Sequence, residues 1–476
     1  MDYKSRSREE LIALCKEKGI KGYSGKKKNE LVDLLSKTVD STETSTGGES
    51  TETSTIEDGL SRLTVRSTGA TRNALSLFSG AGGDTCGLEA AGWTVTHFSE
   101  FNNHAIQTHE NAFPTSKLLK TKESTDIKKI PDEMFAELKG AVDLIFAGFP
   151  CQGFSHAGKK REDDPRNELV HEFARAARII QPEWIIGENV KGLLSRKGVY
   201  PADTPARPII EIIHDIFEEI GYKITYRVID VREVGVPQLR KRLIIVGHRG
   251  TLYPHVPWDE FLAIPETLGI RHILKPTLAD AMELPALYKP QEQAARFWIE
   301  TTETAPSGKP HPNLERLVAG KRNLTSKEKK DAKLPENAKV EYIEKNGLIS
   351  FGVRKSGYHG QVLDPDAPSK TIICAYTQCP RLFVGLYNPK VKKYWVRCLT
   401  YEECAQIQGF PIDYPWQGAL KDKIVQIGNA VPPPLASTMT SMLEKTTFHS
   451  RPQVVAQAPA PAHGRGGDTD SSDEDD

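Results

Sequence analysis

Long hydrophobic runs are missing from this 476-residue sequence. Its apolar stretches fall far below the roughly twenty residues that cross a bilayer, and no signal peptide is visible. We therefore expect an intracellular protein without membrane contact, in the cytoplasm or the nucleus. Cysteine is also scarce: seven residues are thinly spread, and their odd number implies no disulfide framework. Because no C-x-x-C spacing occurs among them and no histidine pairs with them, no metal site is expected.

A net charge of either sign is equally absent, because 63 basic residues balance 63 acidic ones. No chain-wide basic bias therefore points to nucleic acid, although a neutral chain can still carry local basic patches. The charges are unevenly placed: residues 1–36 lean basic, residues 38–58 carry only acidic charges, and residues 468–476 end in an acidic run. Any contact with phosphates should therefore be local.

A short apolar run, Leu144–Ala147, predicts a buried strand that Gly148 and Pro150 bring to an end. Cys151 follows directly, just past the carboxyl end of this strand, where open α/β sheets place their chemistry. Taken alone, the cysteine could equally be an inert core residue, since free cysteine is among the most buried residue types. The other segments of the sequence decide between a cysteine that takes part in chemistry and an inert core cysteine.

A glycine-rich turn after an earlier strand predicts a nucleoside site. Residues 74–83 hold a short apolar strand that runs into this turn, and residues 94–100 hold a second strand that ends in Glu100. Glycines let the backbone approach a ligand, and an acid at a strand end can accept hydrogen bonds from ribose hydroxyls. The glycines at 80, 82 and 83 do not fit the G-x-G-x-x-G frame that holds a pyrophosphate. A nucleoside cofactor without a pyrophosphate is therefore expected.

Four more segments follow in order: 184–190, 228–247, 397–411 and 426–436. Together with the glycine-turn region and the strand before Cys151, these six segments closely resemble the DNA (cytosine-5) methyltransferase family. The resemblance covers roughly residues 73–443, apart from a variable stretch near 250–390. It implies an α/β, doubly wound S-adenosylmethionine-dependent methyltransferase core with a Rossmann-like sheet and a smaller inserted target-recognition domain.

The implied reaction is methylation of cytosine C5 in double-stranded DNA at a specific short sequence, with S-adenosyl-L-methionine as the cofactor. One alternative is an RNA methyltransferase on the same scaffold, whose relatives carry Pro-Pro-Cys-Gln where this chain has Phe149 before Pro150. The other is a non-catalytic DNA-binding regulator that keeps the fold. The presence of Cys151, Glu188 and Arg242, together with Gln238, argues against it.

Cytosine C5 is too weak a nucleophile to take a methyl group until a thiolate adds at C6 of the ring. By resemblance, Cys151 supplies this thiolate to a base flipped out of the duplex. Glu188 would hold N3 of the base, and Arg240 and Arg242 would face its O2 and the flanking phosphate, with Arg242 closer to O2. A surface salt bridge for Glu188 and a solvated basic edge for the arginines are the alternatives.

The resemblance also assigns cofactor contacts. Phe78, Gly80 and Gly82 would contact the methionine portion, and Glu100 would contact the ribose. The adenine would be contacted by Phe101, Asp126, Ile127 and Pro150. Asn429 and Val431 would form the closing wall of the site. Core packing is the alternative for Phe78, and a helix cap is the alternative for Asp126.

The DNA contacts are expected in three places. Residues 152–167 resemble the family's mobile loop, with Gln152, Ser155 and Arg166 as contacts, and an ordinary surface loop is the alternative. Gln238 is expected to meet DNA as well. Two short predicted helices in residues 1–37 resemble a SAP-type DNA-binding module with a basic turn of Lys26, Lys27 and Lys28. A protein-interaction helical hairpin is the alternative for this segment.

The expected organisation divides the chain into six parts. These are the SAP-like module 1–37, a disordered acidic linker 38–72, the catalytic core 73–250, the target-recognition domain 251–390, the C-terminal part of the core 391–447 and a disordered acidic tail 448–476. We expect a monomer that binds double-stranded DNA, with a cognate restriction endonuclease as a candidate partner. The basic run 321–330 is predicted either to meet phosphates or to be a solvated face.

Overall fold

The computed structural model describes Lys28 and residues 72–150, 169–200, 205–284, 292–318, 342–345, 348–351 and 360–453. The chain divides into two compact units, Met1–Ser54 and Thr55–Asp476, and of the first unit only Lys28 is described. Several expectations concern residues outside this range. They are the SAP-like module with Lys26 and Lys27, the linker, Cys151, the loop with Gln152, Ser155 and Arg166, the run 321–330, and the tail from residue 454.

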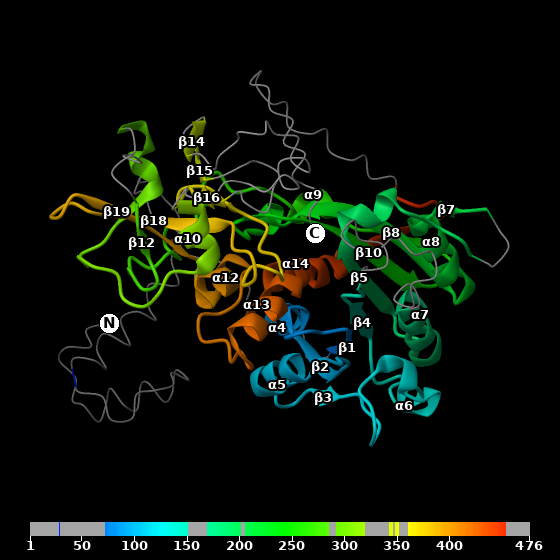
Figure 1. Ribbon diagram of the computed structural model, residues 1–476. Coiled ribbons are helices and arrows are strands. Elements are labelled where there is room, and N and C mark those ends of the chain that lie inside the picture. Colours follow the sequence, from blue (N-terminus) through cyan, green and yellow to red (C-terminus); the bar gives the residue numbers. More distant parts are fainter. Residues whose placement is uncertain are drawn as a thin grey trace. The chain divides into compact units, whose positions relative to one another are not determined.

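The first sheet of the second unit has seven strands in the order β3-β2-β1-β4-β5-β10-β8 (Figure 1). Their bounds are β1 (Arg72–Leu77), β2 (Trp93–Phe98), β3 (Lys117–Leu118), β4 (Leu144–Ala147), β5 (Trp184–Val190), β8 (Tyr222–Asp230) and β10 (Lys241–Arg249). The first five strands in this order pair in parallel, whereas β10 is antiparallel to both β5 and β8. The α/β expectation is confirmed. The sequence does not predict the reversal of β10, because an apolar run does not encode strand direction.

Helices and short turns connect these strands. They are α4 (Gly83–Ala90), α5 (Asn103–Ala112), η1 (Ile127–Lys129), α6 (Asp132–Ala136), α7 (Leu169–Ile180), η3 (Lys191–Ser195), α8 (Ile209–Glu219), η4 (Val231–Val234), α9 (Trp258–Phe261) and α14 (Pro433–Leu443). Small two-strand pairs join β6 (Lys197–Gly198) with β7 (Arg207–Pro208), and β11 (Tyr253–His255) with β20 (Thr447–His449). No helix among the described residues is long and apolar enough to span a membrane.

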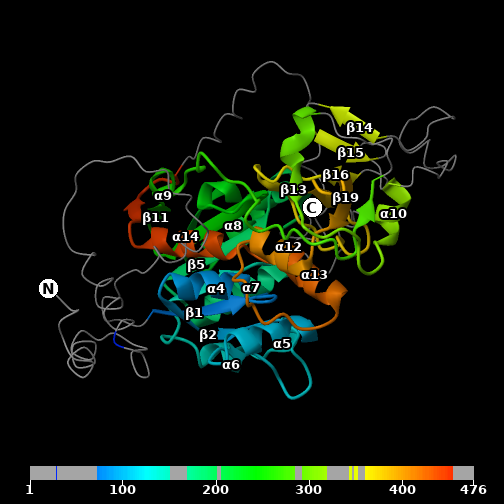
Figure 2. The same ribbon diagram turned by 90° about the vertical axis from the view of Figure 1, so that its left-hand side faces the viewer.

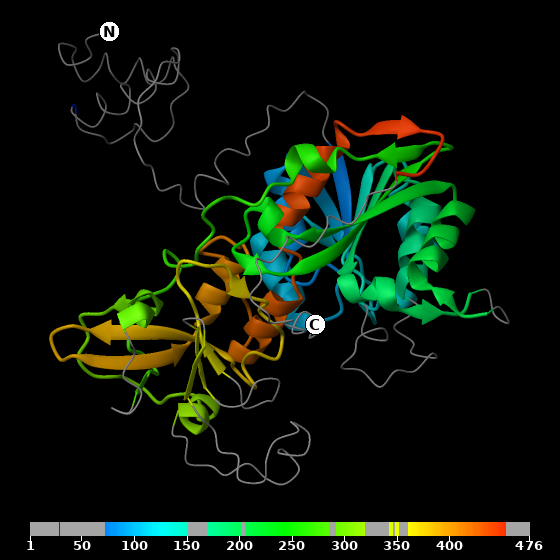
Figure 3. The same cartoon turned by 90° about the horizontal axis from the view of Figure 1, so that it is seen from above.

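Alternate side chains of the parallel strands pack on opposite faces of the sheet. Leu75 and Ile145 belong to a buried cluster with α7 and α8, while their neighbours Ala74 and Leu144 belong to a cluster with α4 and α14. Figure 3 shows helices on both sides of the sheet. Strands buried on both faces are apolar at every position, which is why β4 could be located as a continuous run in the sequence.

A second sheet follows in the chain, with the order β12-β19-β18-β16-β15-β14 and β13 paired to β18. Its strands are β12 (Met282–Glu283), β13 (Trp298–Glu300), β14 (Tyr342–Lys345), β15 (Leu348–Phe351), β16 (Gly360–Val362), β18 (Leu382–Asn388) and β19 (Lys393–Cys398), accompanied by η6 (Glu292–Phe297) and α10 (Pro312–Val318). The helices α12 (Tyr401–Ile407) and α13 (Leu420–Asn429) lie between this sheet and the α4–α5 region (Figure 2).

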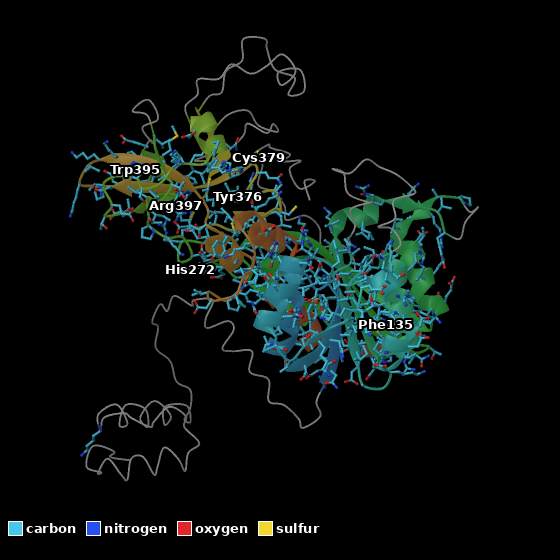
Figure 4. The ribbon with its side chains drawn as sticks, turned by 60° about the horizontal axis from the view of Figure 1, so that its bottom comes forward. Phe135, His272, Tyr376, Cys379, Trp395 and Arg397 are labelled. Atoms are coloured by element: carbon cyan, nitrogen blue, oxygen red, sulfur yellow. The ribbon has the colours of Figure 1, made fainter. Side chains whose placement is uncertain are left out.

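The second sheet does not coincide with residues 251–390, the segment in which the recognition domain is expected. The second sheet extends to Cys398, past residue 390, because β19 pairs along its whole length with β18. At the other end, Trp258 is buried in the cluster that contains α14, so the residues just after 250 pack with the first sheet. A buried ion pair between Arg397 and Glu403 (Nη2–Oε1 2.6 Å) joins the end of the second sheet to α12. Arg397 is labelled in Figure 4.

Main-chain contact joins α14 to α4. A Cβ built on Gly83 would lie 2.2 Å from the carbonyl oxygen of Val431, and one on Gly87 would lie 2.2 Å from that of Pro433. No side chain larger than hydrogen fits at either position without moving the backbone. The two glycines therefore set how closely the C-terminal helix approaches the first helix of the sheet.

We predict that Gly87→Ala lowers the free energy of unfolding by about 1–3 kcal/mol, the usual cost of overpacking a core. In a helix without this contact, alanine would be more favourable than glycine by about 1 kcal/mol. A loss of stability must therefore come from the contact with α14. Urea titration of the full chain measures it. Gly192→Ala is the control, because a Cβ there would meet only Val190 Cγ2 at 4.0 Å. A Gly87→Ala protein as stable as the wild type would contradict the prediction.

Candidate active site

The carboxyl ends of β4 and β5 lie side by side, since Ala147 pairs with Gly187. At this edge the carbonyl oxygen of Phe149 accepts a hydrogen bond from Asn189 Nδ2 at 3.1 Å. The chain leaving β4 is thereby held next to the residue that follows Glu188. Pro150 is half-buried there, and Cys151 is the next residue, outside the described part of the chain.

Glu188 and Arg242 form an ion pair, with Nε and Oε1 2.9 Å apart. Their side chains are only 12 % and 5 % exposed, so the pair is not the surface salt bridge considered as an alternative. The strands explain the contact, because Arg242 lies opposite Val190 in the β5–β10 ladder and Glu188 lies opposite Ile244. Arg242 Nη1 also donates to the carbonyl oxygen of Lys241 at 2.8 Å. A carboxyl group and a guanidinium are thus presented together at the end of β5.

Gln238 occupies a different setting from the DNA contact expected of it. It lies in β9 (Gln238–Leu239), which pairs with β17 (Ser369–Lys370), and it is 0 % exposed. Its Nε2 donates to Gln408 Oε1 at 2.5 Å, and its Oε1 accepts from the backbone N–H of Ile372 at 3.0 Å. Gln238 is therefore enclosed in this structure, and the DNA contact expected of it stays a prediction.

Arg240, for which a contact with the base is predicted, is buried as well. It is 3 % exposed, and its guanidinium donates to the carbonyl oxygens of Ile372 (3.4 Å), Gly428 (3.1 Å) and Ala430 (3.3 Å). The cause is the two-residue period of an extended chain, in which 238, 240 and 242 point inward while Leu239 and Lys241 are exposed. Arg240 thus connects the end of the strand to Ile372 and to the segment that contains Gly428 and Ala430.

The glycine turn after β1 and the acid after β2 are joined directly. Gly80 N–H donates to Glu100 Oε2 at 2.9 Å, while Glu100 Oε1 accepts from the N–H groups of Phe101 (2.9 Å) and Asn102 (2.8 Å). Burial raises the pKa of Glu100, although these three hydrogen bonds act in the opposite direction. A Cβ on Gly80 would meet no atom within 4 Å, so open space lies beside the turn. Phe101 is 74 % exposed at its edge.

The other predicted cofactor residues surround the same edge or support it. Val431 is buried, and its Cγ2 lies 3.3 Å from the Cβ position of Gly148 at the end of β4. Asn429, the last residue of α13, is exposed. Gly82 lies against Phe113, whose Cε2 would be 2.7 Å from an added Cβ.

Core packing of Phe78 and helix capping by Asp126, the alternatives to contact with the cofactor, are both observed. Phe78 packs partly against the core cluster and adopts a left-handed backbone (φ 57°), which is unusual for a residue with a side chain. Asp126 caps η1, with Oδ1 accepting from Lys128 N–H at 3.1 Å, and Ile127 is buried in the same cluster. Both residues therefore shape the edge of the sheet whether or not they also meet a ligand.

A buried polar chain lies behind the turn, and the sequence analysis missed it. Asp84 accepts hydrogen bonds from the Ser76 hydroxyl and, at 3.1 Å, from the Ser79 hydroxyl. Ser79 Oγ lies 3.4 Å from Thr85 Oγ1, which is 3.0 Å from Nε2 of His109. Burial raises the pKa of Asp84 to about 6 and lowers that of His109 to about 3. Serines within an otherwise apolar strand were the available signal.

The sheet order, the glycine turn after β1 and the acid after β2 together define an S-adenosylmethionine-dependent methyltransferase fold. The family model for C-5 cytosine-specific DNA methylases matches residues 73–445. The chain belongs to this family, and it is a DNA cytosine-5 methyltransferase that uses S-adenosylmethionine as its methyl donor.

Three curated relatives illustrate the similarity. The type II methyltransferase M.PspPI of Psychrobacter is 32 % identical over 371 residues, which is 76 % of this chain and 76 % of that protein. M.Eco47II of Escherichia coli is 31 % identical, covering 75 % of each chain. M.FnuDI of Fusobacterium nucleatum is 30 % identical over 78 % of this chain and 94 % of its own length. The expected reaction, cofactor and DNA substrate are therefore confirmed at the level of the family.

We predict that Asp84 makes stability fall as the pH rises. Its pKa is about 6 in the folded chain and near the ordinary 3.8 when unfolded, so between these values the folded state binds the extra proton. The unfolding free energy should therefore drop by about 3 kcal/mol from pH 3 to pH 7 through this group, at 1.36 kcal/mol per pKa unit. Asp84→Asn should remove that drop.

Urea titrations of the wild type and of Asp84→Asn at several pH values measure this contribution as a difference. The variant should gain stability relative to the wild type as the pH rises from 3 to 7, and the difference should then stay constant. Asp259→Asn is the control, since that side chain is 92 % exposed. A difference that does not depend on pH would show that Asp84 keeps an ordinary titration in the folded chain.

Proposed function

We propose that Cys151 is the nucleophile of the methyl transfer. The observation that carries this proposal is the geometry at the end of β4, where the bond between Phe149 and Asn189 holds the approach to Cys151 beside Glu188. The thiolate adds to C6 of the base, and C5 then takes the methyl group that bound S-adenosylmethionine supplies. Loss of the C5 proton and cleavage of the sulfur–C6 bond restore the aromatic ring and the cysteine. The target base must leave the duplex to reach this site.

Glu188 and Arg242 are proposed to receive the flipped base together. The carboxyl group would meet N3 and the guanidinium would meet O2, stabilising the charge that develops on the ring as sulfur adds. The 2.9 Å pair supports this assignment because each group fixes the orientation of the other before the base arrives. Arg240 would then act behind them, holding the strand end rather than touching the base.

The cofactor site is proposed at the carboxyl ends of β1, β2 and β4. Support comes from the open space beside Gly80, the exposed ring of Phe101 and the half-buried Glu100, which lie next to one another. Glu100 would accept from the ribose hydroxyls and Phe101 would lie against the adenine. The remaining wall would be formed by Phe78, Gly82, Asp126, Ile127, Pro150, Asn429 and Val431.

Target recognition is proposed for the part of the chain that builds the second sheet, roughly residues 282–398. Its position between the two stretches of the catalytic core supports this assignment. The loop 152–167 would close over double-stranded DNA, with Gln152, Ser155 and Arg166 as contacts. We also propose an intracellular monomer without a bound metal. A restriction–modification role with a cognate endonuclease is favoured by relatives that are named type II methyltransferases.

We predict that Cys151→Ala abolishes methyl transfer and leaves cofactor binding nearly intact, because the thiolate attacks the base and not the cofactor. Bisulfite sequencing of DNA from cells that express the wild type first identifies the target sequence. A duplex with 5-fluorocytosine at the target should then trap the wild type as a covalent complex, since fluorine blocks the final elimination. The exposed Cys374 provides the control, Cys374→Ala, which should still be trapped. Methylation by the Cys151→Ala protein would refute the assignment.

We further propose that residues 1–37 form a SAP-like module in which Lys26, Lys27 and Lys28 meet phosphates. Phosphate contacts raise affinity without specifying sequence. A chain that begins at Ser61 should therefore keep the same target and turnover at saturating DNA, while binding DNA more weakly and with a shallower salt dependence. Fluorescence anisotropy over a series of salt concentrations measures both. An unchanged salt slope would favour the alternative of a protein partner for this segment.

A further inference from the structure

The cofactor turn is held in place from behind by the C-terminal part of the chain. Gly80 faces open space, but the next residue, Ala81, is fully buried in a cluster that includes Phe410, Tyr414 and Trp416. These aromatic residues lie in the segment between α12 and α13, more than three hundred positions further along the chain. One side of the turn therefore faces the proposed ligand, and the other side packs against residues that are distant in the sequence.

Tyr414 supplies the polar part of this contact. Its hydroxyl donates a hydrogen bond to the carbonyl oxygen of Ala81, across 333 positions in the sequence. The ring is fixed by Phe410 (ring centroids 4.8 Å apart), Trp416 (4.9 Å) and Phe113 (6.3 Å). Burial raises the pKa of Tyr414 well above its ordinary value, so the hydroxyl keeps its proton and remains a donor.

The two peptide groups that flank the turn are thus fixed in different ways. The Gly80 N–H is bound by Glu100, which faces the proposed ribose, and the Ala81 carbonyl is bound by Tyr414. The Ala81 carbonyl shares its peptide group with Gly82 N–H, which closes the turn by donating to the Ser79 carbonyl oxygen at 2.9 Å. A rotation of this peptide therefore disturbs the hydrogen bond that closes the turn around Gly80. Losing the Tyr414 donor would leave a buried carbonyl unpaired, and the turn would relax toward other arrangements. Those arrangements no longer present Gly80 and Glu100 to the cofactor together.

We propose that Tyr414 is a positioning residue for cofactor binding, which it promotes by holding the Gly80–Gly82 turn through the Ala81 carbonyl. This inference rests on the proposed cofactor site. Tyr414 does not touch the ligand in this scheme. It acts on the fraction of molecules whose turn is already in the binding arrangement, and therefore on affinity and not on the chemical step.

The test is Tyr414→Phe, which removes one hydroxyl and keeps the ring. Calorimetric titration of the full chain with S-adenosylmethionine, without DNA, should show a Kd raised about 5- to 30-fold, as expected for one buried hydrogen bond. In steady-state methylation of genomic DNA from a strain without cytosine methylation, KM for the cofactor should rise similarly. The kcat at saturating cofactor should change less than about 2-fold, because the base site is untouched.

Tyr376→Phe is the matched control. Tyr376, labelled in Figure 4, is also buried, and its hydroxyl donates to a backbone carbonyl, that of Leu382, at 2.6 Å. It accepts from Leu399 N–H as well, so its loss should cost at least as much stability as the loss of the Tyr414 hydroxyl. Its bonds lie in the part that holds the second sheet, and the cofactor Kd should therefore stay at the wild-type value.

The Glu100→Gln variant distinguishes a failure of the role proposed for Tyr414 from a failure of the proposed cofactor site. If Glu100→Gln weakens cofactor binding but Tyr414→Phe does not, the site stands and the role of Tyr414 is refuted. If neither variant changes the Kd, both the site and the inference fall. Equal weakening by Tyr414→Phe and Tyr376→Phe would also overturn the inference, because the effect would then be general destabilisation. Weakening by Tyr414→Phe alone would support its role while removing the ribose assignment of Glu100.

Discussion

The main-chain contact between α4 and α14 is the constraint on which the site depends. At Gly83 and Gly87 the two helices approach to a distance that leaves no room for a Cβ. This contact carries the C-terminal segment to the glycine turn after β1, and it places Val431 against the end of β4. Without it, the proposed cofactor site would consist only of the ends of β1, β2 and β4. The proposed site therefore draws on both ends of the catalytic part of the chain.

A second set of contacts connects residue 430 to the edge at which base binding is proposed. The Ala430 carbonyl oxygen accepts from Arg240 Nη2 and from Gln408 Nε2, and Gln408 in turn accepts from Gln238. Arg242 comes two residues after Arg240 and pairs with Glu188. Residue 430 is thus connected through Arg240 to the strand that carries Arg242. Buried polar groups of this kind favour a single arrangement, because each one left unpaired costs free energy.

The parts of the fold that could be predicted are those with a local signal. The run Leu144–Ala147 gave β4 with its observed bounds, because a parallel strand buried on both faces is apolar at every position. The acid after β2 was located in the same way, from its place after a strand, and the role of the cysteine after β4 stays a prediction. The inward position of Gln238 and Arg240 was not predictable, since a two-residue period does not say which face of the chain is buried. Contacts between distant positions, such as Tyr414 with Ala81, leave no local pattern at all.

Three carboxyl groups near the carboxyl edge of the sheet have different partners. Glu188 has a guanidinium at 2.9 Å, Glu100 has three backbone N–H groups, and Asp84 has two hydroxyls together with backbone N–H groups. Hydroxyls and N–H groups carry no full charge, so they only partly offset the loss of water around a carboxylate. This explains why burial still raises the pKa of both Glu100 and Asp84. A full positive charge is placed beside the carboxyl group at the proposed base site, where charge would change during the reaction.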